Sequence, residues 1–98
     1  MNEMVKQCIE ARKHYLEEGC EIIEEHAFSN CNDLRTIVLP KSVKYVDRYI
    51  ASGTPYLFQL EYKGTSDDWE LIKKAAQWAM GSNIKNIVCS DKTIEMER

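Results

Sequence analysis

The chain of 98 residues lacks most of the short motifs that mark enzymes and nucleic-acid-binding proteins. It has only four glycines, and none of them has the spacing of a phosphate-binding loop. The motifs G-x-S-x-G and H-E-x-x-H are missing as well. No apolar run approaches the roughly 20 residues of a membrane-spanning helix. The formal net charge of -3 is the opposite of the basic excess that nucleic-acid binders show. These absences predict a protein that is not an enzyme and has no cofactor, nucleic-acid partner or membrane span.

The residues that are present describe one ordinary globular domain over residues 1–98. Hydrophobic residues make up 44% of the chain and charged residues 30%, which is typical of such a domain. The beginning, MNEMVKQCIEARKHYLEEG, alternates charged and apolar residues, so it does not have the form of a secretory signal. We therefore expect the protein to be cytoplasmic.

Four cysteines and two histidines are the side chains in this sequence that could form a zinc site of the usual cysteine–histidine type. No C-x-x-C pair occurs, and no set of these residues has the short paired spacing of a zinc site. We predict no metal site. We expect Cys8, Cys20, Cys31 and Cys89 to be reduced thiols that behave as small hydrophobic side chains.

Two segments have the apolar periodicity of amphipathic helices. The first is residues 3–18, followed by Gly19 at the capping position. The second is residues 67–80, for which Thr65 and Asp68 have capping-box spacing, although its apolar arc covers about 180°, wider than one core face needs. The tail, DKTIEMER, predicts a turn and then a short edge strand or a frayed end.

An internal repeat occupies the middle of the chain, with a period of about 23 residues, within the range of repeat proteins. The apolar residues Leu34, Ile37 and Leu39 recur as Leu57, Leu60 and Tyr62. Ile84, Ile87 and Cys89 have the same spacing and suggest a third copy, which arrives later than the period requires because the second predicted helix intervenes.

The segment IEEHAFSNCNDLRTIVLPKSV resembles a unit of the BspA-type leucine-rich repeat family, I-x-x-x-A-F-x-x-C-x-x-L-x-x-I-x-(L/I)-P-x-S-V. The later segments LEYKGTSDDWELIKKA and IVCSDKTI are similar to the closing end of such arrays. The resemblance implies an α/β repeat fold, a short leucine-rich-repeat solenoid with a small parallel sheet. Two coils would span residues 22–65. The helix over residues 3–18 would cap one end, and a helix and closing strand over residues 66–94 would cap the other.

Two groups of polar residues could suggest catalysis, but each has a simpler explanation. Glu24, Glu25 and His26 could form an acid–base cluster, although neighbouring side chains on a loop more often form a solvated edge. Asp67 and Asp68 could form a carboxylate pair, although acidic residues also stabilise the N-terminus of a helix. A cysteine–histidine nucleophile is disfavoured because a buried thiol is inert.

Binding is the remaining class of function, since a repeat of this kind exposes the side chains between its inward positions. Arg35, Thr36, Phe58, Gln59 and Glu61 would share one sheet face, and Trp78 would lie at the rim of the second helix. We predict that these six residues bind another protein, although the sheet face could also be merely solvated and Trp78 could be covered by a terminal segment. The function would be that of an intracellular protein–protein interaction module, a small stand-alone inhibitor or adaptor. The alternative is a structural or self-associating repeat fragment, with a homo-oligomer as its only partner.

Overall fold

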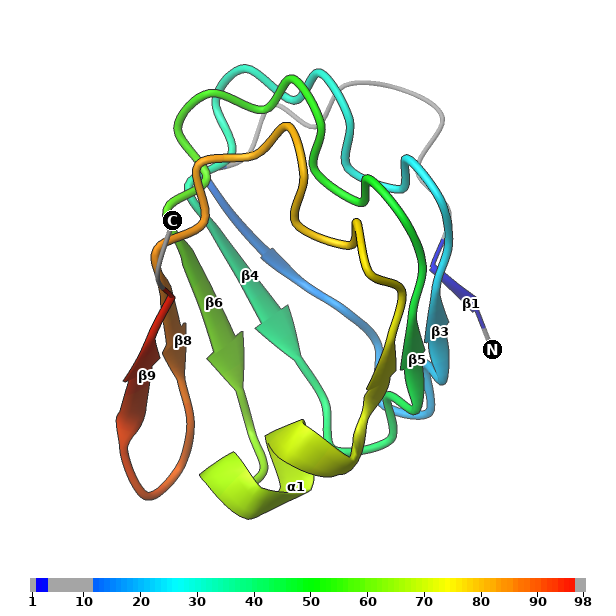
Figure 1. The fold of residues 1–98 in the computed structure, drawn as a ribbon, viewed down its shortest axis with the longest axis vertical. Coiled ribbons are helices and arrows are strands. Elements are labelled where there is room, and N and C mark those ends of the chain that lie inside the picture. The colour runs from blue at the N-terminus through cyan, green and yellow to red at the C-terminus, as the bar shows by residue number, and fades with distance from the viewer. Residues whose placement is uncertain (1, 4–11, 97–98) are drawn as a thin grey trace.

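The computed structural model describes residues 2–3 and 12–96, and their strands form two sheets that face each other (Figure 1). The chain crosses from one sheet to the other and back, so the described strands make three turns of a solenoid. One sheet has the order β1-β3-β5-β7, with β1 at Asn2–Glu3, β3 at Ile22–Ile23, β5 at Tyr45–Val46 and β7 at Lys73–Lys74.

The second sheet has the order β2-β4-β6-β8-β9 and contains the longer strands. These are β2 at Lys13–Tyr15, β4 at Thr36–Leu39, β6 at Gln59–Tyr62, β8 at Asn86–Val88 and β9 at Thr93–Glu95. All neighbours are parallel except β9, which runs antiparallel to β8 at the edge. The predicted short edge strand in the tail is therefore confirmed.

The repeat period sets the register of the second sheet. Thr36 pairs with Gln59, and Lys13 pairs with Thr36, so one turn of the solenoid equals one repeat period in both cases. The turns between the strands repeat in the same way. His26 and Tyr49 both have a positive φ, of 62° and 54°, and so do Asn30 and Gly53, at 61° and 77°. The positive-φ positions of these turns thus recur with the repeat period.

The core lies between the two sheets and is built from the inward positions of each coil. The predicted triplets are all buried: Leu34, Ile37, Leu39, Leu57, Leu60, Tyr62, Ile84, Ile87 and Cys89. Phe28 and Cys31 are also fully buried and fill the turn side of the coil. Because a strand presents alternate residues to opposite faces, this burial leaves the intervening side chains on the outer face.

The helix predicted over residues 3–18 is wrong where the structure describes it. Glu3 belongs to β1 and residues 13–15 form β2, while residues 4–11 lie outside the described residues. Lys13, His14 and Tyr15 extend the second sheet by pairing with Thr36, Ile37 and Val38. The edge of β4 is therefore paired with a strand and is not covered by a helix. Within this strand, His14 occupies an inward position.

The second predicted helix is much shorter than expected. The helix α1 covers Ser66–Leu71, and the predicted capping box is present: Thr65 accepts from the Asp68 amide at 3.1 Å, and Asp68 accepts from the Thr65 amide at 3.2 Å. The chain then enters β7 and a turn over residues 76–80. Lys73 N donates to Lys44 O at 3.1 Å and Ala75 N to Val46 O at 2.9 Å. Hydrogen bonding to β5 thus replaces the remainder of the predicted helix.

Candidate functional site

The outer face of the five-stranded sheet brings together five of the six residues predicted to bind a partner. Thr36 and Gln59 are direct neighbours in one row of this face, and Glu61 lies in the next row. Arg35 and Phe58 precede these strands and lie side by side at their N-terminal ends. The complete rows across β2, β4, β6 and β8 are Lys13, Thr36, Gln59 and Asn86, and then Tyr15, Val38, Glu61 and Val88.

Three aromatic side chains on this face are exposed to solvent. Tyr15 is 61% exposed, Tyr56 50% and Phe58 39%, although aromatic rings are usually buried. The rings of Tyr56 and Phe58 meet edge to face, with 6.5 Å between their centroids. We call Tyr15, Tyr56 and Phe58 the aromatic patch. Its members come from two segments of the chain, β2 and the residues before β6.

Cations lie over each ring of the aromatic patch. Lys13 Nζ is 5.4 Å from the centre of the Tyr15 ring, Arg35 Cζ is 5.4 Å from that of Tyr56, and Lys85 Nζ is 5.4 Å from that of Phe58. Such cation–π contacts contribute about 0.5–1 kcal/mol each at exposed sites. They also hold the rings and the charged groups in a defined arrangement on the surface.

Glu61 is the acidic group in the middle of this face. Its carboxylate lies 3.3 Å from Lys13 Nζ and accepts a hydrogen bond from Gln59 Nε2 at 3.3 Å. The hydrogen bond with Glu61 raises the pKa of Lys13 above its ordinary value. Lys13 therefore remains charged, and the Glu61 carboxylate has its polar partners, Lys13 and Gln59, on the same sheet.

Sequence reasoning missed Lys13, Tyr15 and Tyr56 as members of the site. The first two were assigned to a helix, and Tyr56 belongs to the turn before β6. A signal was present in the sequence, since Met4-Val5 and Cys8 lie one repeat period before Ala27-Phe28 and Cys31. The repeat thus extends towards the N-terminus and would have placed residues 13–15 in register with residues 36–38.

Trp78, the sixth predicted residue, is not on the outer face of this sheet. It lies on the turn after β7, is half-buried, and packs against the core. Its ring meets Trp69 edge to face at 5.7 Å, and Trp69 in turn meets Tyr62 at 5.7 Å. Packing therefore accounts for much of the Trp78 side chain, and its remaining exposed part is separate from the aromatic patch.

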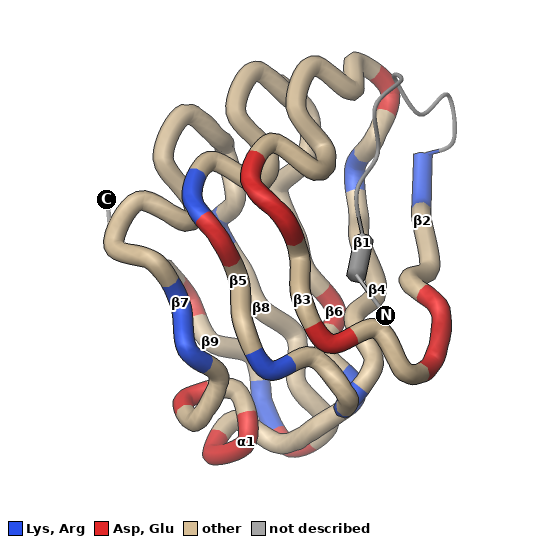
Figure 2. The backbone as a smooth tube through the Cα atoms, turned by 90° about the vertical axis from the view of Figure 1, so that its right-hand side faces the viewer, with Lys and Arg blue, Asp and Glu red and all other residues tan. Residues whose placement is uncertain are grey.

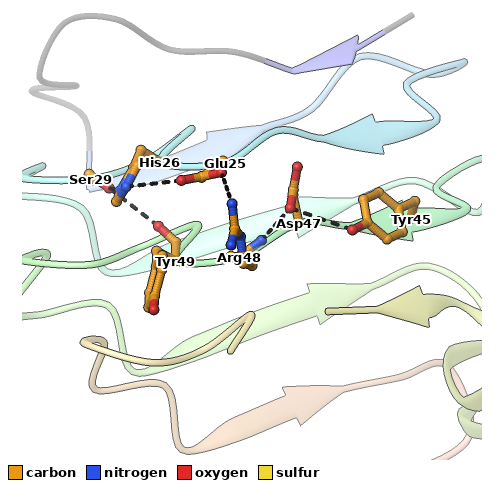
Figure 3. A network of polar contacts seen from close by, with 7 residues as sticks. All are labelled: Glu25, His26, Ser29, Tyr45, Asp47, Arg48 and Tyr49. Atoms are coloured by element: carbon orange, nitrogen blue, oxygen red, sulfur yellow. Dashed lines mark hydrogen bonds and ion pairs between the residues drawn. The ribbon is translucent and has the colours of Figure 1, made fainter. Parts of the chain in front are cut away.

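The acid–base group suggested by Glu25 and His26 is part of a polar network on the coil turns (Figure 3). Glu25 pairs with Arg48 of the next coil at 3.0 Å and lies 3.6 Å from His26 Nε2. The His26 ring stacks on Tyr49 with 5.6 Å between centroids. These side chains link equivalent positions of consecutive coils, which is a structural role for an exposed edge.

Three of the cysteines are buried in the core. Cys20 and Cys31 are fully buried, and Cys89 is 7% exposed. Burial raises the pKa of Cys89, which disfavours the nucleophilic thiolate. Among residues 12–96, no three His, Cys, Asp or Glu side chains come together in a way that could hold a metal ion.

A family model described as BspA type Leucine rich repeat region (6 copies) matches residues 2–98. The chain therefore belongs to the BspA-type leucine-rich repeat family. Neither the comparison with curated proteins nor the comparison with solved structures found a match. Membership in this family indicates a protein-interaction module, because repeats of this class generally act in binding and not in catalysis. α1 is the only helix in the described part of the chain, and it is far too short to cross a membrane.

Proposed function

We propose that this protein is a small stand-alone binder, an inhibitor or adaptor of another protein, and that it contacts its partner through the outer face of the five-stranded sheet. The observation that carries the proposal is the aromatic patch. Tyr15, Tyr56 and Phe58 expose apolar surface to water on the outer face of this sheet, opposite the face that packs against the core. A partner that covered these rings would remove that surface from water.

The composition of the face also suits a protein contact. Tyrosine, phenylalanine and arginine are enriched in protein interfaces, and tyrosine, tryptophan and arginine are the residues whose truncation costs most binding energy. Arg35, Phe58 and Glu61 would supply the main contacts, and Thr36 and Gln59 would lie between them. Trp78 is a second candidate contact through its exposed part.

We also propose that the protein acts in the cytoplasm. The proposal rests on Cys89, which fills a core position as a free thiol. Secreted domains of this size more often use their cysteines in disulfides.

The proposal for the sheet face is tested with a triple variant, Arg35→Ala, Phe58→Ala and Glu61→Ala. A matched control is Glu70→Ala, Leu71→Ala and Lys73→Ala, which removes one acid, one apolar side chain and one base from exposed positions at α1 and β7. Both proteins and the wild type would be used to capture partners from cell extract, followed by titration of the captured protein.

The triple variant should bind the captured protein at least about tenfold more weakly, a change of about 1.4 kcal/mol, and the control should bind it normally. Both variants should keep their melting temperature nearly unchanged because exposed substitutions cost about 0.5 kcal/mol or less. Normal binding by the triple variant would contradict the proposal. If the capture experiment recovers only further copies of this protein, the alternative of a self-associating repeat unit is favoured.

A further inference from the structure

Only some of the lysine and arginine side chains in the described part of this acidic chain form ion pairs with carboxylates. Lys44, Arg48 and Lys63 each contact a carboxylate at 3.0 Å or less, and Lys13 contacts Glu61 at 3.3 Å. Arg12, Arg35 and Lys85 form no ion pair with any of residues 12–96, and Arg35 and Lys85 lie over aromatic rings instead. Each of these three residues directly precedes a strand of the five-stranded sheet.

These three cations lie in one row at the N-terminal ends of the strands. Arg35 N and Thr36 N both donate to Arg12 O, at 2.8 Å and 3.1 Å, and Lys85 N donates to Phe58 O at 2.8 Å. The order across the sheet is therefore Arg12, Arg35, Phe58 and Lys85, which we call the basic row. Neighbouring strands lie about 4.8 Å apart, so the row extends over about 14 Å.

The four-stranded sheet on the opposite side of the molecule differs from this row in its charge. Figure 2 shows charges of both signs over the side formed by β3, β5 and β7. In the basic row, by contrast, one exposed apolar ring lies between a guanidinium group and an ammonium group. A short segment with carboxylates on both sides of an apolar side chain would match all three groups.

We propose that the partner contributes a linear acidic segment that lies along the basic row. This inference rests on the proposed function and adds the chemistry of the partner to it. One apolar side chain of the segment packs against Phe58 and Tyr56. Carboxylates on either side of it approach Arg35 and Lys85, where they meet charges that no described carboxylate neutralises. Contacts of this kind are charge-assisted and are worth about twice a neutral hydrogen bond.

The carboxylates of the sheet determine where the acidic segment of the partner can lie. Glu61 lies in β6, three residues after Phe58, and its ion pair with Lys13 leaves no unpaired cation in the two outer rows of the face. Glu95, which pairs with Asn86 beyond Lys85, repels carboxylates at the edge of the sheet. An acidic segment is therefore confined to the N-terminal ends of the strands. These two carboxylates and the net charge of -3 also disfavour a nucleic acid, whose phosphates would extend past so short a row.

The inference is tested by selecting random dodecapeptides on the immobilised wild-type protein. The selected peptides are then titrated against Arg35→Gln/Lys85→Gln and against a control, Lys41→Gln/Lys73→Gln. The control removes the same charge from two exposed lysines that form no ion pair with residues 12–96, one at the C-terminal end of β4 and one on the other sheet. A single-stranded oligothymidine of matching length is included as a second probe.

The selected peptides should be acidic and carry an apolar residue between their carboxylates. They should bind Arg35→Gln/Lys85→Gln at least tenfold more weakly than the control, and raising the salt concentration should weaken their binding to the wild type. Neutral or basic peptides that lose affinity for the Arg35/Phe58/Glu61 triple variant would overturn this inference and leave the proposed function intact. Selection of no peptide, or tighter binding of the oligonucleotide, would also overturn the inference. Peptides that bind every variant equally would count against both proposals.

Discussion

At the scale of single residues, Thr54 shows how one side chain connects consecutive coils. It is 1% exposed, and its hydroxyl accepts a hydrogen bond from Cys31 N at 3.1 Å and donates one to Phe28 O. Both backbone groups belong to the preceding coil, in the segment between β3 and β4, where no neighbouring strand can bond to them in the regular way. Buried backbone groups of this kind need a partner, and the threonine hydroxyl provides it.

Replacement of Thr54 by valine should therefore be costly although the two side chains have nearly the same shape. Valine leaves the Cys31 amide and the Phe28 carbonyl without their partner, and we expect the free energy of unfolding to fall by about 2–3 kcal/mol. Urea denaturation measures this loss. Thr54→Ser keeps the hydroxyl and loses only a methyl group, so it should cost about 1 kcal/mol. A valine variant as stable as the serine variant would contradict this role.

At the scale of elements, Asp91 fastens the β8–β9 turn to the beginning of α1. Its two carboxylate oxygens accept from Ser66 N and Ser66 Oγ, both at 2.8 Å. These hydrogen bonds lower the pKa of Asp91 below its ordinary value. The carboxylate also lies next to the positive end of the helix, where the Thr65–Asp68 capping box satisfies two further amides.

Asp91→Asn should lower the melting temperature at neutral pH. Folded Asp91 binds a proton more weakly than it does in the unfolded chain, so its contribution is complete above the unfolded pKa and disappears as the pH falls through the folded pKa. The difference between wild type and variant should therefore shrink between about pH 5 and pH 2. Thermal melts at several pH values would show this. A difference that stays constant over that range would mean that the carboxylate charge has no part in the contact.

The elements also show how far sequence reasoning succeeds. The triplet spacing of Leu34, Ile37 and Leu39 predicts the inward face correctly. Ile37 and Leu39 lie two residues apart on one face of β4, and Leu34 precedes the strand and is buried with them. The same spacing misleads at the N-terminus. Residues three apart lie on one side of a helix as well, so a degenerate coil with His14 at an inward position resembles an amphipathic helix.

The second predicted helix fails for a different reason. Residues 66–71 do form a helix, and the capping residues predict its beginning correctly. Its end is decided by tertiary structure, because β5 offers backbone groups to which Lys73 and Ala75 bond. The unusual width of the apolar arc over residues 67–80 was a sign that the segment does not remain one helix. The candidate site was incomplete because the other helix was predicted where β2 forms.

At the scale of the whole molecule, the solenoid should tolerate the loss of one complete coil. Deleting residues 36–58 joins Arg35 to Gln59 and removes one period, so every remaining strand keeps its register. We expect a β-rich spectrum and a cooperative melt at a lower temperature, because one coil interface is lost. Deleting residues 36–57 instead moves Gln59 and Glu61 to the inward face, and this variant should not fold. Equal behaviour of the two deletions would contradict the assigned register.

The claim that the outer face of the five-stranded sheet binds a protein concerns the molecule as a whole, and amide chemical shifts test it most directly. The ¹⁵N-labelled protein would be titrated with the protein that it captures from cell extract. The largest shift changes should fall at Arg35, Phe58 and Lys85, with smaller changes along β4, β6 and β8. The amides of β3, β5 and β7 should change little. Changes confined to these latter strands, with Arg35, Phe58 and Lys85 unaffected, would contradict the claim.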